Sequence, residues 1–334
     1  MPEPSLGLFV AVVVLALGFA VTNGLNDAAN AIATVVGTRV LTPAAAVLMA
    51  AVCNFGGALT GTAVARTVGQ GLLMPGSFGQ QTLIAALAAI VMWGLATSYY
   101  GFPISLTHGL ISGMAGAGLA TAGVTGVQWG SFAKIGLAIV IAPVLGFAAG
   151  YLVMMLLLWV LRSMSTSRVR SIFSNLQIVS AAFMAFSHGR NDGQLPIGVI
   201  TAGLVVYTGS LAIWDSIPLW VMLISATAIT LGTALGGWQV IKTLGARVTT
   251  LRPINGFAAE ASAATVIQVA ATVGIPVSTT HCISAAIMGV GASKRFSAVR
   301  WRVATDIIFV WVTTIPACAL LGWVLAWVAK LFFV

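Results

Sequence analysis

Two stretches of this sequence repeat each other. Residues 26–30 read Asn-Asp-Ala-Ala-Asn, and residues 191–194, which lie 165 positions later, read Asn-Asp-Gly-Gln. A second motif recurs in the same order. Residues 103–109 read Pro-Ile-Ser-Leu-Thr-His-Gly, and residues 276–281, 173 positions later, read Pro-Val-Ser-Thr-Thr-His.

The nearly constant offset between these motifs indicates an internal duplication. Residues 57–61, which begin and end with glycine, match residues 232–236 after 175 positions and add a third common feature. We therefore expect a first repeat at residues 1–165 and a second at residues 166–334, both within one integral membrane domain.

Composition places the repeats in a membrane. Of the 334 residues, 59% are hydrophobic and 6% are charged, whereas a soluble domain has about 25% charged residues. The mean hydropathy is +1.06, which excludes a soluble enzyme, a nucleic-acid binder and a disordered chain. An apolar helix needs roughly 20 residues to cross a bilayer. Apolar runs of about this length lie at 5–23, 42–65, 82–100, 132–161, 216–238, 255–274 and 303–330. Shorter or polar-interrupted runs lie at 26–37, 104–120, 175–189, 192–206 and 277–292. We predict an all-α, multi-pass protein whose first helix is retained, because the first residues of the chain carry no Lys or Arg.

The basic residues predict how the repeats are oriented. The loops at 239–254 and 293–302 are rich in Lys and Arg, including Lys242 and Arg247, but the equivalent loops at 66–80 and 121–131 hold one such residue and none. Basic loops favour the cytoplasm, so equivalent loops lie on opposite sides of the membrane. This pattern is typical of inverted repeats with an odd number of crossings each. Five crossings per half result if the segment after each Asn-Asp pair is re-entrant, and both termini are then extracytoplasmic at the cell (inner) membrane.

Asp27 and Asp192 occupy matching places beside matching Asn residues. A carboxylate inside a membrane segment is costly and indicates function. Each Asp could also cap a short helix, and the two roles are compatible because transporters place their sites at broken helices. Asn and Asp oxygens suit Na⁺, and an Asp could instead carry a proton. For Glu260, a membrane-edge ion pair and a further cation ligand are both open.

The two Pro-Ser motifs predict an anion site. Helices that begin at these motifs point free N–H groups and a positive dipole end at whatever lies in front of them. Ser105, Thr107, Ser278 and Thr280 add hydroxyl donors, and together these groups suit a small oxyanion. The alternative is that they are ordinary Ser/Thr caps.

The remaining polar residues of the motifs are harder to assign. His108, His188 and His281 all fall inside the repeated motifs, and for each of them we favour a structural role over proton coupling. Arg190 could pair with the anion, neutralise Asp192, or turn toward the cytoplasmic edge.

Three segments carry a resemblance to a known family. Residues 24–31, 187–194 and 276–281 resemble the inorganic phosphate transporter family of the Pit or solute-carrier-20 type, in its bacterial or archaeal branch. The likeness continues to residues 289–293 and covers nearly the whole chain.

The resemblance implies a secondary symporter of inorganic phosphate that works by alternating access and forms a homodimer. The coupling cation is Na⁺ or H⁺, and no covalent cofactor or nucleic acid is involved. The family's site maps onto Asn26, Asp27, Asn30, Asn191, Asp192 and Gln194, and onto Ser105, Thr107, Ser278, Thr279 and Thr280. We therefore expect the anion at the Ser/Thr positions with Asn26, Asn191, Gln194 and Arg190, and the cation at Asp27, Asp192, Asn30, Asn26 and Asn191.

Three departures from the family pattern bear on the substrate. Arg190 stands where the family usually has a small residue. Leu195 and Pro196 follow Gln194 where bacterial relatives often have a Lys. Leu106 occupies a place where a hydroxyl residue is common. A sulfate permease, or a carrier of another tetrahedral oxyanion, therefore stays open as an alternative. A membrane-embedded enzyme acting on a phosphorylated lipid and an anion channel are less favoured, because each motif supplies a single Asp and the paired motifs indicate coupling.

Overall fold

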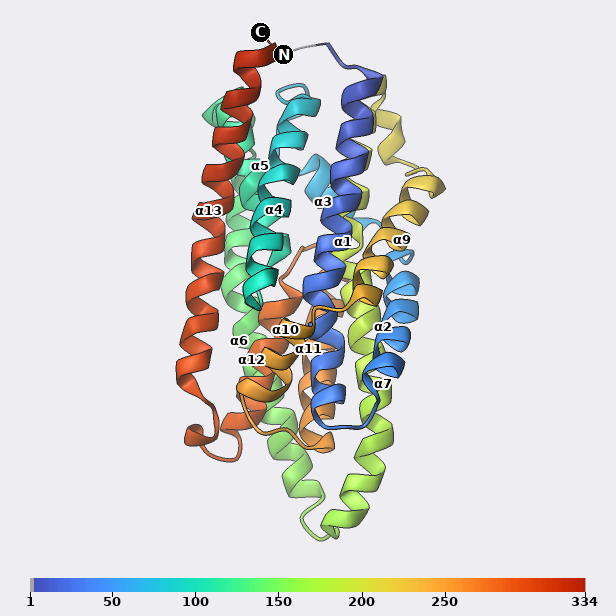
Figure 1. The fold of residues 1–334 in the computed structure, drawn as a ribbon, viewed down its shortest axis with the longest axis vertical. Helices are drawn as coiled ribbons and strands as arrows, with labels where there is room; N and C mark the ends of the chain where they lie inside the picture. The colour runs from blue at the N-terminus through green and yellow to red at the C-terminus, as the bar shows by residue number, and fades with distance from the viewer. Residues whose placement is uncertain (1–2, 334) are drawn as a thin grey trace.

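A computed structural model describes residues 3–333 of the chain as a bundle of helices (Figure 1). Within this range, the side chains of Ala28, Gln239, Lys242, Ala246, Arg247, Phe332 and Phe333 lie outside the description, including the two basic loop residues named above. The first half contains α1 (Leu6–Gly37), α2 (Pro43–Ala58), α3 (Ala63–Gln70), α4 (Gln80–Tyr100), α5 (Leu106–Ala122) and α6 (Trp129–Val160). The second contains α7 (Thr166–Asp192), α8 (Gln194–Thr208), α9 (Leu219–Leu235), α10 (Trp238–Lys242), α11 (Pro253–Thr272), α12 (Thr279–Ala292) and α13 (Trp301–Phe333). Short 3₁₀ or π turns occur at Val124–Gly126, Leu211–Trp214, Thr243–Arg247 and Phe296–Ala298, and residues 3–333 hold no β-strand beyond one isolated bridge between Leu73 and Val127.

Membrane-length helices confirm the predicted class. By length and composition, five helices in the described part of the chain could cross a bilayer, or six if the bent pair α2–α3 counts as one span. This pair is bent by 69°, so a broken helix of the predicted kind is present, although it lies within the apolar run at 42–65 and not at an Asn-Asp pair. The number of long spans is smaller than the five crossings per half that we expected, partly because α5, α9 and α12 have only 17, 17 and 14 residues and because α7 and α8 count as one span.

The prediction of a re-entrant segment after the first Asn-Asp pair was wrong. Helix α1 runs unbroken from Leu6 to Gly37, because residues 27–36 contain neither glycine nor proline and their backbone groups stay paired within the helix. In the second half the helix is interrupted at Gly193 alone, between α7 and α8.

The two halves pack by exchanging their helices. Helix α5 lies against α13, and its counterpart α12 lies against α6. In the same way α1 packs on α9, and α2 on α7. Figure 1 shows α1 running from the end of the molecule where α13 finishes toward the α6–α7 loop, while α7 runs back in the opposite direction. Matching helices are therefore inverted relative to each other, as the charge pattern predicted.

Equivalent glycines allow these exchanged helices to approach closely. A Cβ atom on Gly57 would lie 2.1 Å from the carbonyl oxygen of Phe186 in α7, and one on Gly232 would lie 2.1 Å from that of Val21 in α1. Small residues at such crossings let helix backbones touch inside a membrane, where the hydrophobic effect does not draw helices together.

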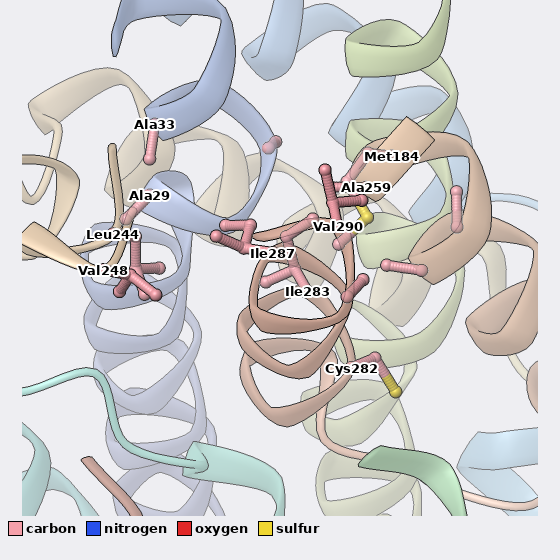
Figure 2. Packing of buried hydrophobic residues seen from close by; sticks show 14 of the residues in the cluster. Ala29, Ala33, Met184, Leu244, Val248, Ala259, Cys282, Ile283, Ile287 and Val290 are labelled. Carbon is pink, nitrogen blue, oxygen red and sulfur yellow. The ribbon is translucent and has the colours of Figure 1, made fainter. Parts of the chain in front are cut away.

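A polar layer separates two apolar clusters in the core. In one cluster, buried residues of α1 between Val12 and Phe19 pack with side chains of α8. In the other, buried residues of α1 between Ala29 and Val35 pack with residues of α7, α11 and α12. Figure 2 shows Ile283 and Ile287 of α12 in the second cluster, with Ala29 of α1 and Met184 of α7 nearby. The Asn-Asp motifs of α1 and α7 lie between the clusters along their helices, so the fold places them near its centre.

Adjacent glycines of α2 provide a test of this packing. We expect Gly57→Ala to lower the stability of the protein by about 1–3 kcal/mol, because the added methyl group overlaps the α7 backbone. A Cβ on Gly56 has nothing within 4 Å, so Gly56→Ala is the matched control and should be neutral or stabilising by up to about 1 kcal/mol. Thermal unfolding of both variants in detergent measures the difference. Equal midpoints for the two variants would contradict the proposed close contact.

Candidate functional site

Helices α5 and α12 enter the centre of the molecule with the same cap. The Ser105 hydroxyl accepts a hydrogen bond from the His108 backbone N–H at 3.1 Å, and the Ser278 hydroxyl accepts one from His281 N–H at 3.1 Å. Both serines have extended backbone conformations, and a proline lies two residues before each of them. The caps start each helix at the level of the Asn-Asp motifs and place Thr107, Thr279 and Thr280 in the first turns.

Asp192 is the most heavily bonded carboxylate of this site. The hydroxyl groups of Thr107 and Thr279 donate to its two oxygens at 3.3 and 3.1 Å, respectively. The Asn23 amide lies 3.5 Å from Oδ2, and the amide of Asn191 donates to Oδ1. Because Asp192 is fully buried, these donors offset the cost of removing a charged group from water.

Asp27 is bonded by the opposite repeat. The Thr280 hydroxyl donates to its Oδ1 at 2.8 Å, which reverses the relation between Thr107 and Asp192. Asn30, one helical turn farther along α1, donates its amide to Thr279 and Thr280 oxygens at 3.2 and 3.0 Å. Each repeat therefore supplies a hydroxyl group to the carboxylate of the other.

His188 joins the two carboxylates, a role that we did not predict. Its Nε2 lies 3.2 Å from an Asp192 oxygen and 3.8 Å from an Asp27 oxygen, and one ligand atom from each of the three residues lies within 4.8 Å of the others. Its Nδ1 lies 2.8 Å from the Asn54 amide oxygen, and the Asn54 amide donates to Thr233. The four-residue spacing between His188 and Asp192 was a signal for a shared helix face.

Three asparagines of α1 present unpaired oxygens. The side-chain oxygens of Asn23, Asn26 and Asn30 are buried and have no hydrogen-bond donor, although their amide N–H groups are bonded. Residues spaced by three or four positions share one face of a helix, and this face also carries Asp27. Amide and carboxylate oxygens are the ligands that hard cations prefer, so this face could hold such an ion.

Several predicted site residues have structural partners instead. Ser105 and Ser278 cap their helices, and Asn191 bridges to the backbone of Val277 through both its amide and its oxygen. Gln194 accepts hydrogen bonds from Val64 and Ala65 N–H at the start of α3, and its amide donates to the Arg190 carbonyl. The Asn26 amide donates to Ser98 at 2.8 Å. These contacts keep the broken helices and hairpin tips in place.

Arg190 and Glu260 lie apart from the carboxylate pair. The Arg190 backbone packs beside Gly57 of α2, and its buried Nε has no hydrogen-bond partner. Glu260 of α11 accepts hydrogen bonds from Thr34 and Ser180, and Gln177 donates to it at 3.4 Å. Hydroxyl and amide groups surround Glu260, and no salt bridge to it occurs among the described residues, so the alternative of a membrane-edge ion pair is not what the structure contains. Its role as a cation ligand stays a prediction.

The other two histidines form an aromatic stack beside the hairpin tips. The His108 and His281 rings meet edge to face at 4.8 Å between centroids, and His281 stacks on Trp311 at 3.8 Å. The indole N–H of Trp311 donates to the Pro103 carbonyl. This stack connects the starts of α5 and α12 to α13.

The sequence pattern of the phosphate transporter family matches residues 23–322. The chain belongs to the phosphate transporter family. This match includes both Asn-Asp motifs and both hairpin tips, and it confirms the predicted family. Members are named as transporters, which also confirms the prediction of a transporter rather than an enzyme.

Relatives match this phosphate transporter family member from end to end. A Bacillus subtilis protein named a probable low-affinity inorganic phosphate transporter is 39% identical, over 98% of each chain. A Rhizobium meliloti protein of the same name is 43% identical, over 94% of each chain. A solved structure titled the sodium-dependent phosphate transporter is 26% identical, with a TM-score of 0.88, and covers 98% of this chain and 100% of its own.

Packing in the core explains one departure in the first motif. Leu106 takes the place of Thr279 in the duplication, and it is fully buried in the apolar cluster beside Gly94. Thr279, by contrast, donates to Asp192 and accepts from Asn30. The two hairpin tips are therefore chemically unequal, and the second one carries the additional hydroxyl group.

Two positions of α12 test these site contacts. We expect Thr280→Val to lower stability by about 1–3 kcal/mol, because the variant removes the hydroxyl bonded to Asp27 and Asn30 while keeping the side-chain shape. The buried Ser284 hydroxyl has no partner, so Ser284→Ala in the same helix is the control and should be neutral or stabilising. Thermal unfolding of the purified variants measures both changes, and an unchanged midpoint for Thr280→Val would contradict the assigned contacts.

Proposed function

We propose that this chain is a secondary symporter of inorganic phosphate that couples uptake to Na⁺ by alternating access. The observation that carries the proposal is the meeting of two buried carboxylates, one from each inverted repeat, with hydroxyl groups from both hairpin tips. This arrangement combines donors for an oxyanion with ligands for a cation in one buried place.

In this proposal, phosphate is bound between the starts of α5 and α12. The Thr107, Thr279 and Thr280 hydroxyls can rotate from the carboxylates toward a phosphate oxygen, and the N-terminal ends of both helices favour a negative charge. Ser105 and Ser278 contribute by fixing the first turns of these helices rather than through free hydroxyl groups.

The cation is proposed to bind along the Asn-Asp face of α1 and its counterpart on α7. Asp27 and Asp192 supply negative charge, and Asn23, Asn26 and Asn30 supply amide oxygens without donors. Na⁺ is favoured over H⁺ because several neutral oxygens serve a metal ion and not a single proton. The name of the similar solved structure, a sodium-dependent phosphate transporter, supports the same choice. Glu260 is proposed as a further cation ligand because it is a buried carboxylate, and the Thr34 and Ser180 hydroxyl oxygens beside it could also serve as ligands once their protons turn away.

Electrostatics gives the reason for coupling. An anion placed beside two carboxylates is repelled in a buried site of low dielectric constant, and a cation between them offsets this repulsion. Phosphate is favoured over sulfate because its P–OH group can donate to a carboxylate. In the proposed site both Asp27 and Asp192 contact the hydroxyl groups that would turn to the anion.

Orientation and assembly complete the proposal. Excess Lys and Arg in the loops at the α6–α7 end favour a cytoplasmic position for that end, and in this proposal both termini are then extracytoplasmic. The homodimer that the family resemblance implies is retained as part of this proposal.

We expect Asp27→Asn and Asp192→Asn each to reduce coupled phosphate uptake to the background level, since each removes a charge from the cation site. Asp306, which is exposed in α13, provides the control variant Asp306→Asn with the same charge change outside the site. Uptake of radiolabelled phosphate into proteoliposomes measures activity, and thermal unfolding checks that the variants remain folded. Full uptake by either site variant would remove that carboxylate from the mechanism.

Ion gradients test the coupling directly. Proteoliposomes with the wild-type protein should accumulate phosphate against its gradient with an inward Na⁺ gradient, and not in Na⁺-free acidic buffer. Sulfate, assayed in parallel, should not accumulate. Accumulation driven only by protons would replace Na⁺ in the proposal, comparable accumulation of sulfate would overturn the assigned substrate, and downhill flux indifferent to both cations would contradict symport.

A further inference from the structure

A cavity of about 690 Å³ opens at the α6–α7 end of the molecule, away from the carboxylate site. The end of α6, the start of α7 and the segment that leads into α11 form its walls. Figure 1 shows the α6–α7 hairpin reaching beyond the other helices at this end. Nothing in the proposed transport reaction uses this cavity.

Three arginines line the cavity, and none is neutralised. Arg162 follows α6, Arg170 lies in the first turns of α7, and Arg252 caps α11. None of the six acidic residues of the chain lines the cavity, and in the described part of the chain none of these three arginines forms an ion pair. The positive charge extends to Lys294, whose pKa is lowered by burial and by the neighbouring Arg252 charge. A concave site with this charge favours an anion.

Most of the other residues in the wall are apolar, although Thr38, Thr166 and Ser167 also line it, and this composition narrows the kind of anion that fits. Leu157, Leu158 and Leu161 of the α6 end face the cavity, with Leu251 and Ile254 opposite. The Thr38 hydroxyl, a polar group of the lining, already donates to Gln177 at 2.8 Å. A free inorganic ion gains nothing from five aliphatic side chains, whereas an amphiphile can place its chains against them and its headgroup beside the arginines.

The residues at the end of α6, beside the cavity, also fit an amphiphilic anion. Helix α6 is apolar throughout its last turns and ends at Val160, and exposed Leu158, Trp159 and Val160 precede Arg162. The Arg162 guanidinium lies 5.8 Å from the Trp159 ring centroid, an arrangement typical of the boundary between acyl chains and headgroups. The residues around the cavity are thus of the kind expected at the level of lipid phosphate groups.

We propose that this cavity binds the headgroup of one anionic phospholipid, whose phosphodiester pairs with Arg162, Arg170 and Arg252 while its acyl chains follow the leucines of α6. Arginine suits this role because its planar group can donate two hydrogen bonds to one phosphate. A lipid bound there would link α6 of one repeat to α7 and α11 of the other.

Native mass spectrometry of the full-length protein in detergent tests the proposal, with phosphatidylglycerol as the probe and phosphatidylcholine as the neutral lipid. We expect the wild type to retain one phosphatidylglycerol per chain and to prefer it over phosphatidylcholine. The variant Arg162→Gln/Arg170→Gln/Arg252→Gln should bind phosphatidylglycerol roughly 100-fold more weakly, because each basic residue near the surface contributes about fivefold.

The matched control is Arg168→Gln/Arg295→Gln/Arg302→Gln, which removes the same charge from exposed arginines that do not line the cavity. The control should bind phosphatidylglycerol like the wild type. Equal loss in both triple variants, or none in the cavity variant, would overturn the proposal. A parallel titration with inorganic phosphate separates the two sources of the anion: if the cavity variant loses a phosphate site that the control keeps, the cavity binds free phosphate and the lipid proposal is wrong. Phosphate uptake is not part of this readout, so the result is independent of the proposed symport.

Discussion

Two carboxylates enclosed in a membrane protein impose the main constraint on this structure. Asp27 and Asp192 are buried, and a bilayer interior offers no water to stabilise them, so protein groups must supply the hydrogen bonds. Neighbours on the same helix supply only part of these contacts, as Asn191 and His188 do for Asp192, so the rest must come from other helices. Donors therefore come from hairpin tips that begin at the same depth, and capping serines, short helices and close glycine contacts bring those tips to the centre.

Duplication meets this constraint by letting each repeat complete the other. Thr107 donates to Asp192 and Thr280 donates to Asp27, so the exchange is reciprocal at equivalent positions. The symmetry is then broken by particular side chains. Leu106 is buried where Thr279 forms hydrogen bonds, and Asn23 occupies the place that matches His188. Asp192 consequently has more donors than Asp27, and the two carboxylates are chemically distinct.

The motifs predicted the centre of the site better than its surroundings. Asp27, Asp192, Thr107, Thr279 and Thr280 do lie together, because inversion about matching motifs brings equal depths into contact. The roles of Gln194 and Asn191 could not be seen, since their partners are backbone groups of α3 and of the residue before Ser278. The position of His188 between the two carboxylates does not follow from its own motif, because its partners lie on both repeats. The polar residues Asn26 and Asp27 predict a break in α1, but the helix continues through them because helix-forming residues keep the backbone paired.

The exchange of helices between repeats has a consequence for how the protein is made. Asn30 and Asp27 obtain their hydroxyl partners from residues about 250 positions later in the chain. At roughly 5–20 residues per second, the ribosome needs about 10 to 50 seconds to reach them. Asp192 is missing from the polar face of α1 for most of this interval, and the α12 hydroxyls are missing for all of it. The nascent first half therefore cannot reach its final packing alone, and folding of the site can be completed only after the last third of the chain has been synthesised.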